Sequence, residues 1–319
     1  MKKIFYKKNI IIISILSALI LAIIIFLIVF YNHGNIPKKY RGKWVLHTYY
    51  LSDSDELDKT FTLEIKKNSI ASNSTTTKLE YEIDGYNFII VYVNPETNER
   101  FKEYVLLEGN KLYLSQDKKI DKLDICYYKS GSTAEKDNIL QTRADYYASN
   151  IEVFANQSLK ETIHSDKTIS IININDLTEE QKNKKDDLNY YYAFYNAFSN
   201  TVEIAINRDT GKLANIKYTE NLSITNDSNV AASNTSAALY GICCLIYADN
   251  LDIKNINEAD ELQKSSAKLY ATTTVATLLK KATEEKSYIT TLENDRAGIF
   301  LSSPIYKTNG EMSIRVTEK

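Results

Sequence analysis

Residues 10–31 read IIIISILSALILAIIIFLIVFY, and this run decides how the chain is organised. It holds no charged residue, and as an α-helix it would reach about 33 Å, enough to cross the roughly 30 Å hydrocarbon core of a bilayer. A core helix of a soluble protein would show a polar face, whereas this run is apolar all round. The sequence therefore predicts a transmembrane anchor over residues 10–31, a linker over residues 32–39 and a large body after it.

The flanks of this run indicate its orientation. Residues 1–9 carry four lysines and no acidic residue, which favours a cytoplasmic tail and an extracytoplasmic body. Basic residues also follow the run closely, so a body that faces the cytosol is the alternative. A cleaved signal peptide fits less well, because signal h-regions span only ~7–15 residues and no A-x-A-like site follows here. We expect a single-pass signal-anchor protein of the cell membrane with an extracytoplasmic body.

Composition excludes one class of partner for the body. Ile, Lys, Asn and Tyr are abundant, which is typical of the A/T-rich codons of a low-GC bacterium. The chain has 39 Lys and Arg against 41 Asp and Glu, and four of these lysines precede the anchor, so the body is acidic. Nucleic-acid-binding proteins usually carry a basic face, and we expect no nucleic acid as a partner. About 290 residues follow the anchor, which predicts two domains.

Three cysteines, Cys126, Cys243 and Cys244, all lie in apolar stretches. Their number is odd and no C-x-x-C occurs, so a disulfide framework or a zinc site is not indicated. Buried free thiols are the default in such surroundings. A bridge from Cys126 to one of the vicinal pair is the alternative in an oxidising compartment. We expect no metal and no cofactor, because no spacing of ligands or phosphate-binding loop is present.

Residues 40–129 show the pattern of an all-β domain. Phe61, Leu63 and Ile65 fall on one face of an alternating segment, and polar residues fall on the other. Similar short segments are separated by Gly, Pro and Asn turn residues. The predicted strands span residues 43–51, 59–66, 79–83, 86–93, 101–107, 111–114 and 123–129. Strands without helices between them predict an antiparallel barrel or sandwich.

The start of the first strand, Tyr40-Arg41-Gly42-Lys43-Trp44, resembles the G-x-W signature of lipocalin-like (calycin) barrels. The resemblance covers residues 38–129 through Gly42-Lys43-Trp44, and the remainder of the chain is not recognised. It implies that Trp44 closes one end of a barrel that holds an apolar ligand. A simple core role for Trp44 is the alternative interpretation.

Residues 130–137 form a small, polar linker, and residues 138–319 predict an α+β domain. Apolar residues at helical spacing predict helices over residues 138–162, 234–247 and 257–286. Alternating segments predict strands over residues 168–174, 201–206, 213–222, 288–292, 298–302 and 312–316. The turn between residues 206 and 213 contains Asp209 and Gly211, which predicts a hairpin.

The densest aromatic stretch is Tyr190-Tyr191-Tyr192. On a helix such rings would cover most of the circumference and pack in a core, whereas exposed rings would favour a partner or glycan surface. We therefore name Trp44, Tyr190, Tyr191 and Tyr192 as candidate ligand-binding residues.

No complete catalytic motif is present, and we assign no catalytic residue. The sequence predicts a membrane-anchored, extracytoplasmic binding or assembly module without catalytic activity, for an envelope protein partner or an apolar small molecule. The alternative is a cell-envelope enzyme, a hydrolase, whose active site is assembled from distant loops and is not visible as a motif.

Overall fold

The computed structural model describes residues 35–49, 58–73, 78–84, 87–117, 125–161, 164, 168–197, 200–221, 228–250, 261–285, 289–293, 297–302 and 311–318. The chain divides into two compact units, residues 1–46 with 60–135 and residues 47–59 with 136–319. The predicted anchor, residues 10–31, lies outside the described residues. Among the helices that the structure does describe, none has the length and apolar character needed to cross a membrane.

The first sheet has eight strands in the order β3-β2-β1-β8-β7-β6-β5-β4. Strands β4 to β8 pair antiparallel in sequence order, and β1 pairs antiparallel with β8. The two end strands of this order, β3 and β4, also lie close to each other. The sheet is therefore a nearly closed barrel, as predicted. Its strands are β1 (Gly42–Tyr49), β2 (Asp58–Ile65), β3 (Ile70–Ser72), β4 (Lys78–Asp84), β5 (Asn87–Val93), β6 (Arg100–Glu108), β7 (Lys111–Ser115) and β8 (Ile125–Lys129).

The barrel interior is an apolar core built from alternate residues of these strands. Leu63 and Ile65 of β2 are buried there, on the face predicted from the alternation. They pack with inward-facing side chains of the other strands, since successive residues of a strand point to opposite faces. The buried members of this cluster are Ile36, Tyr40, Trp44, Leu63, Ile65, Ile70, Phe88, Ile90, Val105, Leu112, Leu114 and Tyr127.

The second unit holds an antiparallel sheet of seven strands in the order β13-β14-β15-β12-β11-β10-β9. Its strands are β9 (Ile171–Asn173), β10 (Tyr190–Ala197), β11 (Asn200–Asn207), β12 (Leu213–Asn221), β13 (Ile289–Glu293), β14 (Ala297–Ser302) and β15 (Glu311–Glu318). Its helices are α2 (Thr133–Glu161), α3 (Glu179–Lys185), α4 (Ser228–Asn250) and α5 (Glu261–Glu285). This arrangement confirms the α+β prediction.

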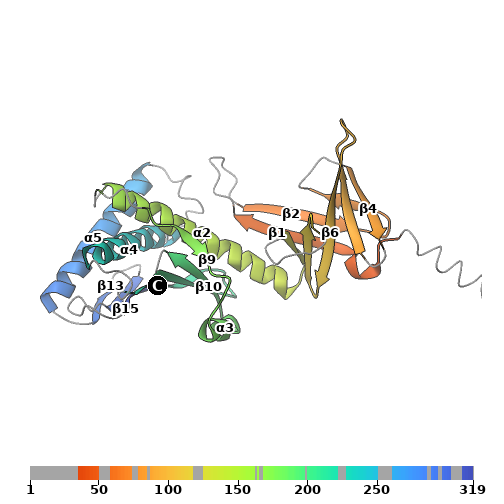
Figure 1. Cartoon of the computed structure of the whole chain (residues 1–319). Coiled ribbons are helices and arrows are strands. Elements are labelled where there is room, and N and C mark those ends of the chain that lie inside the picture. The colour runs from red at the N-terminus through yellow and green to blue at the C-terminus, as the bar shows by residue number, and fades with distance from the viewer. Residues whose placement is uncertain are drawn as a thin grey trace, which may run out of the picture. The chain divides into compact units, whose positions relative to one another are not determined.

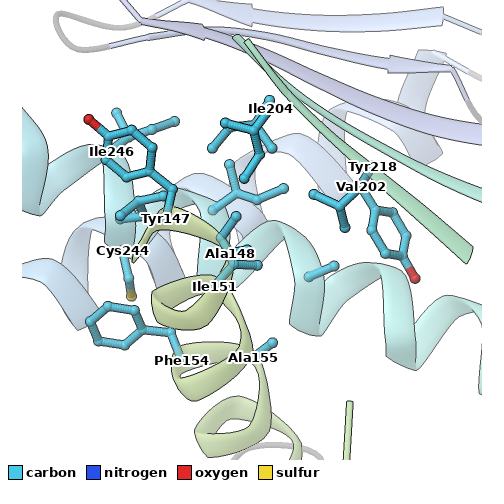
Figure 2. Close-up of a cluster of buried hydrophobic side chains, with 14 of the residues drawn as sticks. Tyr147, Ala148, Ile151, Phe154, Ala155, Val202, Ile204, Tyr218, Cys244 and Ile246 are labelled. Atoms are coloured by element: carbon cyan, nitrogen blue, oxygen red, sulfur yellow. The ribbon is translucent and has the colours of Figure 1, made fainter. Parts of the chain in front are cut away.

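Helices α2, α4 and α5 pack on one face of this sheet, and α3 lies on the other (Figure 1). Figure 2 shows the core between sheet and helices, to which Ile151 and Phe154 of α2, Cys244 of α4 and Ile204 of β11 contribute. The helices α2 and α4 approach each other closely at Gly241. A Cβ there would lie 2.6 Å from the Ile151 carbonyl oxygen, so only glycine allows this contact.

Candidate functional site

Trp44 lies in the core at one end of the barrel, which we call the Trp44 end. Its side chain is 1% exposed, and its indole Nε1 donates to the backbone oxygen of Tyr40 at 2.7 Å. The Lys129 Nζ lies 5.0 Å from the ring centroid, within range of a cation–π interaction. The short 3-10 helix η1 (Lys38–Tyr40) positions Tyr40 for this contact. Trp44 therefore fills the core at this end of the barrel.

The glycine of the G-x-W segment has a physical role at the same end. Gly42 has φ +135°, a conformation that side chains disfavour, and a Cβ there would lie 3.2 Å from Lys129 Nζ. The absence of a side chain lets Lys129 reach the carbonyl oxygen of Arg41, to which its Nζ donates at 3.1 Å. Gly42 thus allows Lys129 to lie over the Trp44 ring.

The opposite end of the barrel, which we call the Phe101 end, exposes large apolar side chains. Phe101 at the start of β6 points to the same inner face of the strand as the core residue Val105, yet its side chain is 56% exposed. Ile125 at the start of β8 points to the same inner face as the core residue Tyr127 and is 51% exposed. Burial therefore falls along the barrel from the Trp44 end to the Phe101 end. An apolar molecule would gain most contact at the Phe101 end, since apolar surface there still faces water.

A carboxyl group lies on the inner face of the barrel, one inward position deeper than Phe101. Glu103 follows Phe101 by two residues on β6 and pairs across the sheet with Ile90, which belongs to the barrel core. Its Oε2 atom is buried and has no hydrogen-bond partner among the described residues. A buried polar atom that makes no hydrogen bond costs about 1–3 kcal/mol. This carboxylate oxygen therefore lacks the donor that a buried acceptor normally has, at least among the described residues.

Tyr92 of β5 is the polar neighbour of Glu103. Tyr92 pairs with Phe101, and its hydroxyl hydrogen-bonds the Glu103 carboxyl group. Burial raises the pKa of Glu103, and this hydrogen bond opposes the rise in part. Burial, together with the Glu103 charge, also raises the pKa of the Tyr92 phenol, which therefore stays protonated as a donor. With Tyr92 as the donor, Glu103 Oε2 still accepts no hydrogen bond from the described residues.

The aromatic run of the second unit forms a strand, β10, so its rings alternate between the two faces of the sheet. Tyr191 is buried on the helix-covered face. Tyr190 and Tyr192 lie on the other face, with ring centroids 6.4 Å apart, and Tyr192 stacks on Phe194. Tyr190 is 36% exposed, and Leu188 just before the strand is 88% exposed. The structure thus places Tyr191 in a core and leaves part of Tyr190 at the surface.

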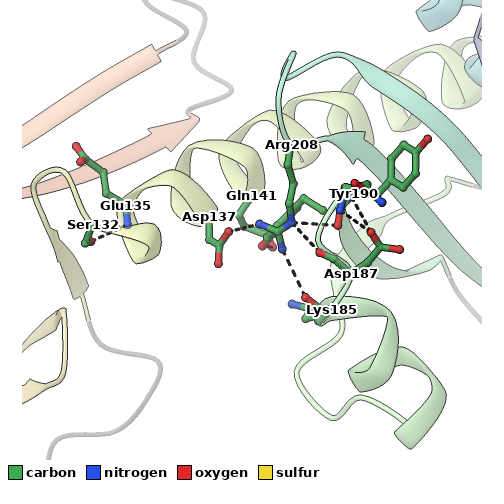
Figure 3. Close-up of polar contacts among 10 residues, drawn as sticks. Ser132, Glu135, Asp137, Gln141, Lys185, Asp187, Tyr190 and Arg208 are labelled. Carbon is green, nitrogen blue, oxygen red and sulfur yellow. Dashed lines mark hydrogen bonds and ion pairs between the residues drawn. The ribbon is translucent and has the colours of Figure 1, made fainter.

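Arg208, which follows β11, links the segments around Tyr190 (Figure 3). Its Nε donates to the carbonyl oxygens of Asp187 and Tyr190 at 3.0 and 3.2 Å, and its Nη1 pairs with Asp137 of α2. The guanidinium carbon also lies 5.3 Å from the centroid of the Tyr191 ring. Arg208 is thus committed to structural contacts that join α2 to the start of β10.

A hydrogen-bond network fixes the buried tyrosines of β10 against α2. The Tyr191 hydroxyl donates to Gln141 Oε1 at 2.7 Å, and the Tyr195 hydroxyl donates to Asp145 Oδ1 at 2.9 Å. Asn173 of β9 also donates to Asp145 Oδ1 at 3.0 Å. Burial, followed by the Asp145 charge, raises the pKa of Tyr195 well above its ordinary value. These polar groups are paired with one another, which indicates a structural network.

Neither Glu103 nor Tyr92 was among the residues predicted from the sequence. The sequence pattern that could have indicated Glu103 is its place between Phe101 and Val105, which puts all three side chains on the same inner face of β6. Comparison of the chain with protein-family models, with curated proteins and with solved structures finds no match.

Proposed function

We propose that this chain is a membrane-anchored binding module without catalytic activity, and that its barrel binds a small, mainly apolar molecule at the Phe101 end. The proposal rests on the buried Oε2 of Glu103, which has no hydrogen-bond partner among the described residues, and on the exposed apolar side chains of the Phe101 end. Binding sites for small molecules are mostly apolar with a few polar groups that fix orientation. Phe101 and Ile125 supply the apolar surface, and Glu103 supplies the polar group.

The Trp44 end supports this assignment by contrast. Its large side chains are packed on one another, and Trp44 already has partners for its indole and its ring face. Side chains that are already in contact gain little from a ligand, whereas half-exposed ones gain about 25 cal/mol for each Å² removed from water. The proposed ligand contacts are therefore Phe101, Ile125, Tyr92 and Glu103, and Trp44 serves as a core residue.

Ligand-dependent stabilisation of the barrel tests this function. Trp44 is the single tryptophan of the chain, so its fluorescence reports urea unfolding of the barrel unit. The full chain is placed in lipid nanodiscs and titrated with hexanol, hexylammonium and hexanoate, which share one apolar tail. We expect at least one of them to raise the unfolding midpoint saturably, because a ligand that binds the folded state stabilises it.

A variant at the rim shows whether this stabilisation arises at the proposed site. Phe101→Ser removes apolar contact worth about 1 kcal/mol and should weaken the apparent affinity roughly five- to tenfold. Ile172→Ser is the matched control, since Ile172 is a 63% exposed apolar residue of the second unit. The function is wrong if none of the three compounds stabilises the barrel, or if both variants respond alike.

A further inference from the structure

The chemistry around Glu103 narrows the ligand class, an inference that rests on the proposed function. We infer that the natural ligand carries an ammonium group that donates to Glu103 Oε2, and that its apolar body packs against Phe101 and Tyr92. Three observations support this assignment: the different hydrogen bonding of the two carboxylate oxygens, the charges that act on Glu103, and the aromatic residues near it.

The two oxygens of Glu103 are used differently. The carboxyl group accepts a hydrogen bond from the Tyr92 hydroxyl, whereas Oε2 is buried and accepts none from the described residues. A ligand donor at Oε2 would complete the pairing of the group. A charged donor does this best, because hydrogen bonds between ionised partners are about twice as strong as neutral ones.

Among the described residues, no positive charge offsets the charge of Glu103. The influences on the Glu103 pKa are burial, which raises it, and the Tyr92 hydrogen bond, and no lysine or arginine of the described residues contributes. Lys129, whose ammonium group lies over the Trp44 ring, donates to the Arg41 carbonyl oxygen at the Trp44 end. A cationic ligand would therefore supply the missing counter-charge, whereas a carboxylate ligand would be repelled.

Aromatic residues lie on the strands around Glu103. Phe101 and Tyr92 are cross-strand neighbours at this end, and Tyr127 of β8 acts electrostatically on Tyr92. Cations are attracted to ring faces within about 6 Å of the ring centroid, more strongly where water is excluded. An ammonium group next to Glu103 would therefore also gain from these rings, while a neutral alcohol would not.

The compounds with a hexyl tail separate the ligand classes, because they differ only in their head group. In the full chain in nanodiscs, we expect hexylammonium to bind the barrel about tenfold more tightly than hexanol. The reason is that its charged ammonium group forms a stronger hydrogen bond with Glu103 than a hydroxyl group does. Hexanoate should bind more weakly than hexanol, since its charge repels Glu103.

Substitution of the carboxyl group identifies the residue responsible. Glu103→Gln keeps the side-chain shape but removes the charge, so it should lower the affinity for hexylammonium about tenfold and leave hexanol within about twofold. Glu108→Gln is the matched control. Glu108 lies on the same strand but points to the opposite, outer face, so this variant should change neither affinity. Trp44 fluorescence verifies that each variant retains a folded barrel.

The possible failures are distinguishable. If hexanol binds as tightly as hexylammonium, or if Glu103→Gln weakens both equally, the ammonium assignment is wrong while binding of an apolar molecule stands. If no compound of the series stabilises the barrel, the proposed function itself is wrong, and the ammonium assignment falls with it.

Discussion

At the scale of single residues, burial of Glu103 lowers the stability of the folded barrel when the carboxyl group is ionised. Its folded-state pKa is raised by burial, so ionisation above that pKa is less favourable in the folded state than in the unfolded one. The barrel therefore keeps its full stability below the pKa of an unfolded glutamate, about 4.3, and loses part of it as pH rises through the folded pKa.

The raised pKa of Glu103 predicts how Glu103→Gln changes stability with pH. Without ligand, the variant should be more stable than the parent at a pH above the raised pKa of Glu103, where the parent carries the buried charge. The difference should disappear below about pH 4, where Glu103 is protonated in both states. Urea unfolding followed by Trp44 fluorescence measures both conditions. A variant that is less stable above that pKa would show that Glu103 is a structural residue of the barrel.

At the scale of elements, strand β5 shows how the outside of the barrel is completed. Its inward residues belong to the main core, but its outward residues Ile89, Val91 and Val93 are also buried. Ion pairs between the strands on either side, Arg100 with Glu80 at 2.9 Å and Lys102 with Glu82 at 2.6 Å, cross this stripe. Exposed ion pairs contribute little by their charge, so their main effect is to lay aliphatic stems over β5.

We therefore expect an outward-facing residue to matter more than an inward-facing one. Val91→Ala removes two methyl groups from a fully buried site and should lower the free energy of unfolding by about 2 kcal/mol. Ile125→Ala, on the inner face but half exposed, should cost less than about 1 kcal/mol. Urea unfolding of both variants, monitored at Trp44, tests the order. Equal losses would mean that the charged side chains do not shield β5.

The same strand shows which parts of the fold the sequence could predict. Leu63 and Ile65 alternate with polar residues, so their inward direction was readable and is confirmed. The run FIIVYV at residues 88–93 has no alternation, because both faces of β5 are buried, and its orientation depends on charged residues of neighbouring strands. Register across strands also brings Tyr92 beside Glu103, and no short-range pattern encodes that pairing.

Two other elements illustrate the limits of local patterns. Strand β3 has only three residues and was not predicted, because a segment that short has too few positions to show alternation. Residues 190–192 are equally consistent with a helix or a strand when taken alone. Their strand conformation follows from pairing with β11 along its whole length, which places Tyr191 and Tyr190 on opposite faces.

At the scale of the whole molecule, the cysteines are distributed over two units that have separate cores. Cys126 lies on the barrel strand β8, whereas Cys243 and Cys244 lie in α4 of the second unit. All three are free thiols, so the bridge considered from the sequence is not formed. Burial raises the pKa of Cys244 to about 12 and also raises those of Cys126 and Cys243. Since the thiolate is the reactive form, the native protein offers little thiol reactivity.

This low background makes a test of membrane orientation possible. Leu188 is 88% exposed, and Leu188→Cys introduces an accessible thiol in the second unit. If residues 10–31 anchor the chain with its body outside, a membrane-impermeant maleimide added to intact cells should label the variant strongly and the parent weakly. A cytosolic protein with an exposed cysteine should stay unlabelled in the same cells. Labelling of the variant only after lysis would place the body in the cytosol, and the source of the proposed amine ligand would then be cytoplasmic.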